Sequence, residues 1–209
     1  MKRSADWTTS TLFAAAIVLA LALPVAPARA EAGADAVRTL YATLLDAMRN
    51  GPTLGARGRY ARIEPVVGQV FDLPLMTRLA VGPSWSGMNA AQQQQVIQAF
   101  GHYIAAVYAD RFDSYAGERL EVTGAEQSTG GTIITSRIVK STGEPVEINY
   151  LMRQSGAGWQ IADIYLNGTI SELATRRSEF SSILQSQGVN GLIATLNGKA
   201  AALGAERTS

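Results

Sequence analysis

The sequence predicts an α+β fold in which helices, a curved antiparallel sheet and closing helices follow one another along the chain. Apolar residues recur every three to four positions over residues 35–112 and again over 170–203, as on one face of a helix. Between these regions, residues 119–166 hold four β-rich segments separated by glycine-containing turns, which is typical of an antiparallel meander. At 209 residues, the chain is long enough for one such domain with a sizeable core.

The first thirty residues have the pattern of a secretory signal peptide. Lys2 and Arg3 precede an uncharged apolar run, Leu12–Leu23, and small residues stand at Ala28 and Ala30. As a helix this run is about 18 Å long, too short for a hydrocarbon core of about 30 Å. We therefore expect residues 1–30 to be cleaved, leaving a single domain over 31–203 and a loose tail over 204–209.

The composition excludes several kinds of chemistry. The chain has 18 Lys and Arg, 17 Asp and Glu, one His and no Cys. The predicted signal peptide contains three of the basic residues and one of the acidic ones, so the mature chain has 15 basic and 16 acidic residues. This near-neutral balance gives no reason to expect nucleic-acid binding. The absence of Cys excludes disulfides, thiol nucleophiles and a lipoprotein signal, and the lone His argues against a zinc site.

The helical region begins with a stripe from Val37 to Met48, which Asn50-Gly51-Pro52 ends. Asn89 and Gln92 have the spacing of a capping box and open a long helix that ends near Phe112. Between them we expect three further helices, over 54–62, from Pro65, and from Asp72 to Gly82-Pro83.

Four strands are predicted after the long helix, over 120–123, 132–140, 146–153 and 159–166. Alternation in the third strand places Val146, Ile148, Tyr150 and Met152 on one covered face. Helical spacing then returns over 170–185 and 189–203, which predicts two closing helices.

Two side chains are candidates for catalysis, and each has a structural alternative. His102 borders the apolar face of the long helix, where a structural hydrogen bond is the commoner role. Asp163 lies inside the last strand and could be a general base, as in small isomerases with a cone-shaped sheet, or a carboxylate paired with an arginine. No cluster of Asp, Glu and His has metal-ligand spacing, so no metal site is expected.

Two blocks resemble the MlaC family, also known as the toluene-tolerance family. The first, VFDLPLMTRLAVGPSWSGMNAAQQQQVIQAFGHYIAAVYADRFDSYAG over residues 70–117, has a phenylalanine-led helix, a G-x-x-W turn and a capped helix. The second, over residues 159–199, is similar to the family pattern W-x-[IV]-x-D-[IV], followed by Gly, Ser, Arg and Phe. The residues that match it in order and spacing are Trp159, Asp163, Gly168, Arg177 and Phe180.

The second block departs from the family pattern in two ways. Thr169 follows Gly168 directly, so Ser171 stands one place later than the family's serine, and Arg176 replaces an aromatic residue. This form of the loop is similar to the hopanoid-associated subgroup called HpnM.

The resemblance implies a non-enzymatic lipid carrier of the periplasm that works as a monomer without a cofactor. The family fold joins a curved sheet, related to the NTF2-like cone, to a helical subdomain, with acyl chains in an apolar cavity between them. The cargo would be a phospholipid or a hopanoid. The partners would be an outer-membrane lipoprotein complex and an inner-membrane ABC transporter with an MCE-domain ring, a system that maintains outer-membrane lipid asymmetry. The alternative is an isomerase- or hydrolase-like enzyme on an NTF2-like cone, with Asp163 or His102 as base.

Lipid binding requires apolar surface, because about 30 methylenes of a two-chain lipid oppose transfer into water by on the order of 20 kcal/mol. For each candidate lining residue, the alternative is ordinary core packing. The candidates are Phe71, Leu75, Leu79, Trp85, Ile97, Phe100, Ile104, Tyr108, Ile148, Tyr150, Met152, Trp159 and Ile161. Structural roles are expected for Asp163, Gly168, Arg177 and Phe180, with Asp163 and Arg177 pairing to tie the final helix to the sheet.

Overall fold

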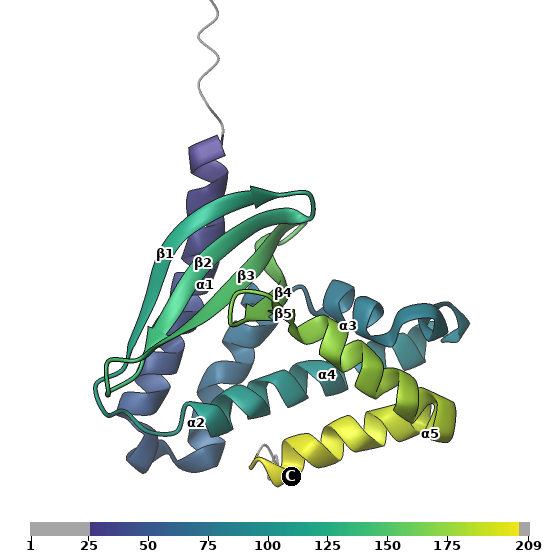
Figure 1. Cartoon of the computed structure of the whole chain (residues 1–209). Coiled ribbons are helices and arrows are strands. Elements are labelled where there is room, and N and C mark those ends of the chain that lie inside the picture. The colour runs from purple at the N-terminus through teal and green to yellow at the C-terminus, as the bar shows by residue number, and fades with distance from the viewer. Residues whose placement is uncertain (1–25, 205–209) are drawn as a thin grey trace, which may run out of the picture.

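The computed structural model describes residues 26–204 and has the α+β architecture that the sequence predicts (Figure 1). Its elements follow in the order α1 (Ala26–Arg49), α2 (Gly51–Val70), α3 (Leu73–Val81), the 3-10 helix η1 (Gly82–Gly87), α4 (Ala90–Arg111), β1 (Arg119–Ser128), β2 (Gly131–Val139), β3 (Pro145–Ser155), β4 (Gly158–Leu166), β5 (Ile170–Ser171) and α5 (Glu172–Ala202). Most of the predicted signal peptide, residues 1–25, and the end of the predicted tail, 205–209, lie outside the described residues.

The strands form one antiparallel sheet in sequence order, β1-β2-β3-β4-β5. The register pairs Ile148 with Leu166 and Tyr150 with Ile164, so these four side chains share one face. A bulge follows at Ala162, because Leu151 pairs with Asp163 whereas Met152 pairs with Ile161. The sheet is therefore a simple meander, with β1 longer than predicted and the two-residue β5 added at the end.

Helix α1 packs lengthwise against the inner face of the sheet (Figure 1). Val37, Leu40 and Leu44 are fully buried in this layer, as their helical spacing predicts. The Tyr41 ring meets the ring of Tyr150 edge-on, with 5.9 Å between centroids. The N-terminal helix thus covers part of the inner face of the sheet.

Helix α2 differs from the two helices predicted over this region. Pro65 does not begin a helix but lies inside α2, and the break falls instead at Gly55, whose φ is 60° and ψ is −178°. Pro65 lacks a backbone N–H and so removes one hydrogen bond from the helix interior. Burial of Ile63 and Val67 on either side keeps the segment helical in spite of that loss.

The capping box predicted for the long helix is confirmed. At the start of α4, the Gln92 N–H donates to the Asn89 side chain at 2.9 Å, and the Asn89 N–H donates to Gln92 Oε1 at 3.0 Å. Asp72 likewise caps α3 by accepting from the Leu75 N–H at 3.1 Å. These caps fix where both helices begin.

The last helix, α5, is bent at Gly188, where φ is 67° and ψ is −169°. The two closing helices predicted by the sequence correspond to the segments on either side of this bend. Figure 1 shows α5 turning back so that its C-terminal segment lies below α4. Within residues 26–204, no helix is long and apolar enough to cross a membrane.

Candidate functional site

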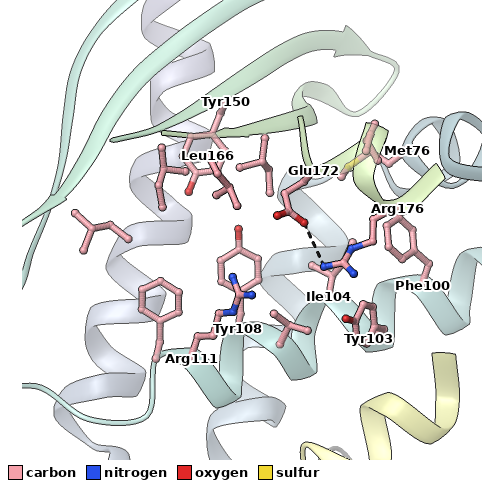
Figure 2. A pocket seen from close by; sticks show the side chains of 16 residues that line it. Met76, Phe100, Tyr103, Ile104, Tyr108, Arg111, Tyr150, Leu166, Glu172 and Arg176 are labelled. Carbon is pink, nitrogen blue, oxygen red and sulfur yellow. Dashed lines mark hydrogen bonds and ion pairs between the residues drawn. The ribbon is translucent and has the colours of Figure 1, made fainter. Parts of the chain in front are cut away.

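A cavity of about 260 Å³ lies between helix α4, the inner face of the sheet and the start of α5 (Figure 2). Helix α4 contributes one continuous stripe, because residues three or four apart share a helical face. The α4 residues that line the cavity are Phe100, Tyr103, Ile104, Val107, Tyr108 and Arg111, with Phe112 directly after the helix.

The opposite wall comes from three strands. Ile148 and Tyr150 of β3 line the cavity beside their register partners Leu166 and Ile164 of β4, and Ile138 extends this wall onto β2. Met76 of α3 and Leu173 of α5 also line the cavity. Alternation along the strands therefore places aliphatic side chains opposite the α4 stripe, as a site for apolar groups requires.

Tyrosine hydroxyls form a small polar cluster behind and within this wall. Tyr41 and Ser136 share a hydrogen bond of 2.7 Å, and the hydroxyl of Tyr150 interacts with those of Tyr41 and Tyr108. Burial raises the pKa of all three tyrosines above the usual value of 10.0. The hydroxyls are therefore neutral at ordinary pH and satisfy one another, so the three tyrosines add no charge to the cavity wall.

The charged side chains that line the cavity are Arg111, Glu172 and Arg176, all of which reach solvent, and we call this part of the lining its mouth. Arg176 donates to Glu172 at 3.2 Å and to Glu179 at 2.9 Å, and its guanidinium lies 5.3 Å from the centroid of the Tyr103 ring. Arg111 both lines the cavity and is exposed to solvent. Figure 2 shows Glu172 paired with Arg176, and Arg111 beside Tyr108.

Asp163 does not line the cavity but holds the start of α5 against the sheet. Its carboxylate accepts hydrogen bonds from the Ser171 hydroxyl at 2.6 Å, from the Leu173 N–H at 3.2 Å and from the Ile164 N–H at 2.8 Å. Ser171 in turn accepts from the Ala174 N–H and caps α5. The carboxylate is therefore committed to helix capping.

The predicted pairing of Asp163 with Arg177 is wrong. Arg177 instead lies against Gly82, where its Nε is 3.2 Å from the position that a Cβ would occupy. The Asp163 carboxylate is occupied instead by the Leu173 N–H at the start of α5 and by the Ser171 hydroxyl, because the first N–H groups of a helix need acceptors from outside it. Phe180, predicted to be structural, is fully buried and packs edge-on against Phe100, with centroids 5.3 Å apart.

His102 also lies away from the cavity. Its Nε2 is 3.3 Å from Glu64 Oε1, an oxygen that also accepts from the Tyr60 hydroxyl at 2.8 Å. The imidazole therefore links α4 to α2 rather than facing the apolar walls. Across residues 26–204, no group of three His, Asp or Glu side chains could hold a metal ion.

The structure brings together only part of the predicted lining. Phe100, Ile104, Tyr108, Ile148 and Tyr150 line the cavity. The predicted residues that lie elsewhere are Phe71, Leu75, Leu79, Trp85, Ile97, Met152, Trp159 and Ile161.

Packing explains why these residues lie outside the cavity. Phe71 is buried behind Tyr108, with ring centroids 6.0 Å apart, and Met152 and Ile161 are buried beyond the bulge in β4. Leu79, on α3, is 45% exposed to solvent. Lining residues that the sequence analysis missed include Tyr103, Arg111, Ile164 and Arg176. Extending the α4 stripe by one turn predicts Arg111, whereas Ile164 requires the strand register.

These features define an α+β protein with an apolar cavity between a meander sheet and a helical layer, charged only at the mouth of the cavity. The chain belongs to the MlaC family, since the family model described as MlaC protein matches residues 38–198. The fold is similar to that of a phospholipid-binding protein from Ralstonia solanacearum, solved in complex with a phospholipid. That similarity has a TM-score of 0.68 at 24% sequence identity and covers 83% of this chain and 98% of the other.

Proposed function

We propose that this protein is a carrier that binds the acyl chains of a lipid in the cavity between α4 and the sheet. The observation that supports this most directly is the distribution of polarity: aliphatic and aromatic walls inside, and charge confined to the mouth. An amphiphile has the complementary distribution. Membership of the MlaC family and the phospholipid held by the Ralstonia protein of similar fold support the same function.

The free energy of lipid binding depends on how much of an acyl chain the cavity can cover. Burying one acyl chain of about 16 methylenes recovers roughly 13 kcal/mol at about 0.8 kcal/mol each. The cavity of about 260 Å³ is slightly smaller than typical ligand sites of about 300–1,000 Å³. We therefore expect it to widen when lipid enters, at the boundary of α4 and the start of α5 where the charged mouth lies.

The wider role that we propose follows from the family. The protein would be exported to the periplasm by a signal peptide over residues 1–30, which is then cleaved, and would act there as a monomer. It would exchange its cargo, a phospholipid or a hopanoid, between an outer-membrane lipoprotein complex and an inner-membrane MCE-domain ABC transporter.

No feature of the site favours the alternative of an isomerase- or hydrolase-like enzyme. Asp163 is fully used in capping α5, and His102 faces Glu64 on the far side of α4. Neither could reach a substrate inside the cavity without breaking those contacts. We infer that binding and release, without catalysis, are the activity of this chain.

Organic extraction of the purified mature protein, followed by mass spectrometry, tests the carrier function. We expect close to one lipid per chain, and uptake of labelled phospholipid from vesicles by protein stripped of its cargo. The mass of the extracted lipid separates phospholipid from hopanoid. Protein that carries no lipid and extracts none from vesicles would contradict the proposal.

A further inference from the structure

The mouth of the cavity carries one cationic side chain that no neighbouring carboxylate neutralises. Arg176 pairs with Glu172 and Glu179, and Glu179 also pairs with Lys199, so these two cations and two anions form a balanced network. Arg111 lies outside that network. Within residues 26–204 it has no ion-pair partner and donates no hydrogen bond, although it lines the cavity.

The position of Arg111 follows from the same stripe that builds the apolar wall. It lies one turn after Val107 and Tyr108 on α4, so its side chain leaves the helix on the cavity side. Both Arg111 and Glu172 are close enough to influence the Tyr108 hydroxyl, with opposite effects on its pKa. Figure 2 shows the Arg111 side chain beside that of Tyr108.

We propose that Arg111 binds the phosphodiester of a glycerophospholipid whose acyl chains occupy the cavity. This inference rests on the proposed carrier function and names the chemical class of its cargo. A phosphodiester bears one negative charge, which matches the single unpaired cation, and a guanidinium binds phosphate oxygens with two parallel hydrogen bonds. An uncharged polycyclic terpenoid offers Arg111 no such partner.

The Glu172–Arg176 pair fixes how the phosphate would sit. Glu172 would repel an anion, but Arg176 holds its carboxylate, and the Arg176 side chain is only 19% exposed. The phosphate is therefore directed to the Arg111 side of the mouth. Because Arg111 is exposed, salt screens its attraction for the phosphate, and selectivity should weaken as ionic strength rises.

The test compares two lipids that differ only in the phosphate-bearing headgroup. Purified mature protein is mixed with vesicles containing labelled dioleoylphosphatidylcholine and labelled dioleoylglycerol, and the ratio of the two lipids bound is measured. We expect the wild-type ratio to fall about tenfold in Arg111→Gln, the effect of losing one charge-assisted contact, and to be intermediate in Arg111→Lys.

Arg78→Gln is the matched control. Like Arg111, Arg78 is an exposed arginine in the last turn of its helix, but it does not line the cavity. Its variant should keep the wild-type ratio, which separates phosphate binding from a general effect of helix-terminal charge. An unchanged ratio in Arg111→Gln would overturn the assignment of Arg111. If the wild-type protein bound neither lipid, the carrier function itself would be overturned.

Discussion

At the scale of single residues, Asp163 shows how a buried carboxylate can match a family pattern and still have a structural role. Only 8% of the residue is exposed, yet its oxygens accept from three donors that belong to β4, β5 and α5. Hydrogen bonds from nearby N–H and O–H donors replace the water that a carboxylate loses when it is buried. Asp163 therefore joins the sheet to the closing helix.

Replacing Asp163 should destabilise the fold without any partner role for Arg177. We expect Asp163→Ala to lower the free energy of unfolding by about 2–4 kcal/mol, since it leaves buried N–H groups without an acceptor. Arg177→Ala should cost about 1 kcal/mol or less, and urea unfolding of the double variant should give additive losses. A coupling above about 1 kcal/mol would show that the two side chains interact after all.

The buried tyrosines make the protein sensitive to alkaline pH. Burial raises the folded-state pKa of Tyr41, Tyr108 and Tyr150 above 10.0, so these hydroxyls keep their protons in the folded state while the unfolded chain loses them. Their contribution is fully present below about pH 10 and is lost as the pH rises above it, by up to about 1.4 kcal/mol per pH unit for each tyrosine.

Urea unfolding at several pH values between 8 and 11 measures this loss, and tyrosinate absorbance reports ionisation directly. Tyr150→Phe should reduce the slope of unfolding free energy against pH by the contribution of one buried tyrosine. Tyr115→Phe is the control, because Tyr115 is 41% exposed and should leave the slope unchanged. Equal slopes for both variants would contradict the role of burial.

At the scale of elements, the bend in α5 depends on a backbone conformation that only glycine adopts readily. Gly188 has φ of 67° and ψ of −169°, and an added Cβ would meet nothing within 4 Å. The cost of Gly188→Ala is therefore backbone strain alone, about 1–3 kcal/mol. Gly198 also has open space around its Cβ position but lies within regular helix, so Gly198→Ala should stabilise by about 0.5–1 kcal/mol.

Thermal unfolding of the two alanine variants distinguishes strain from helix propensity. The melting temperature should fall for Gly188→Ala and rise for Gly198→Ala, although both changes add the same methyl group to the same helix. A rise in both would show that α5 can straighten without loss of packing.

Most elements could be predicted from the sequence because their signals are local. The capping box at Asn89, the stripe of α4 and the alternation of β3 each occur within a few residues. The continuity of α2 through Pro65 could not be predicted, because burial of its neighbours outweighs a single lost hydrogen bond. Nor could β5, since a two-residue strand exists only through its pairing with Tyr165 and Leu166.

The candidate site was harder to predict than the fold for a related reason. Helical spacing predicts Phe100, Ile104 and Tyr108 of the α4 half, which do line the cavity. The same spacing also selects Ile97, which lies outside it, and Tyr103 and Arg111 were not predicted. The strand half depends on register: the bulge at Ala162 places Ile161 and Ile164 on the same face of β4, but only Ile164 lines the cavity. Ile161 bridges Phe71, and Met152 lies against α1 near Gly33. A bulge of this kind leaves no clear trace in the sequence.

At the scale of the whole molecule, the cavity is the space that a bound lipid would occupy. A larger side chain on α4 should therefore fill it and exclude lipid while preserving the fold. We expect Val107→Trp to lower the amount of bound lipid several-fold. Val107→Phe should lower it less, and it replaces the first variant if tryptophan overpacks the site.

Lipid content and melting temperature, measured on the same preparations, test this expectation. Gln94→Trp is the control, because Gln94 is exposed near the start of the same helix and does not line the cavity. Full lipid content in a folded Val107→Trp protein would show that the cargo binds somewhere else.

The isolated bridge between Phe71 and Ile161 covers part of a sheet edge that could otherwise pair with another copy of this protein. The sheet does not close into a barrel, so its two outer strands could pair with strands of other molecules. At one end of the sheet, the two-residue β5 pairs only with the end of β4, and the edge of β4 is also covered by the chain before α3, since Phe71 bridges Ile161 and the Asp72 N–H donates to the Ile161 carbonyl at 2.9 Å. On β1 the free edge is charged and interrupted by a bulge after Val122. An open sheet can therefore cover a cavity without turning its edges into a route to aggregation.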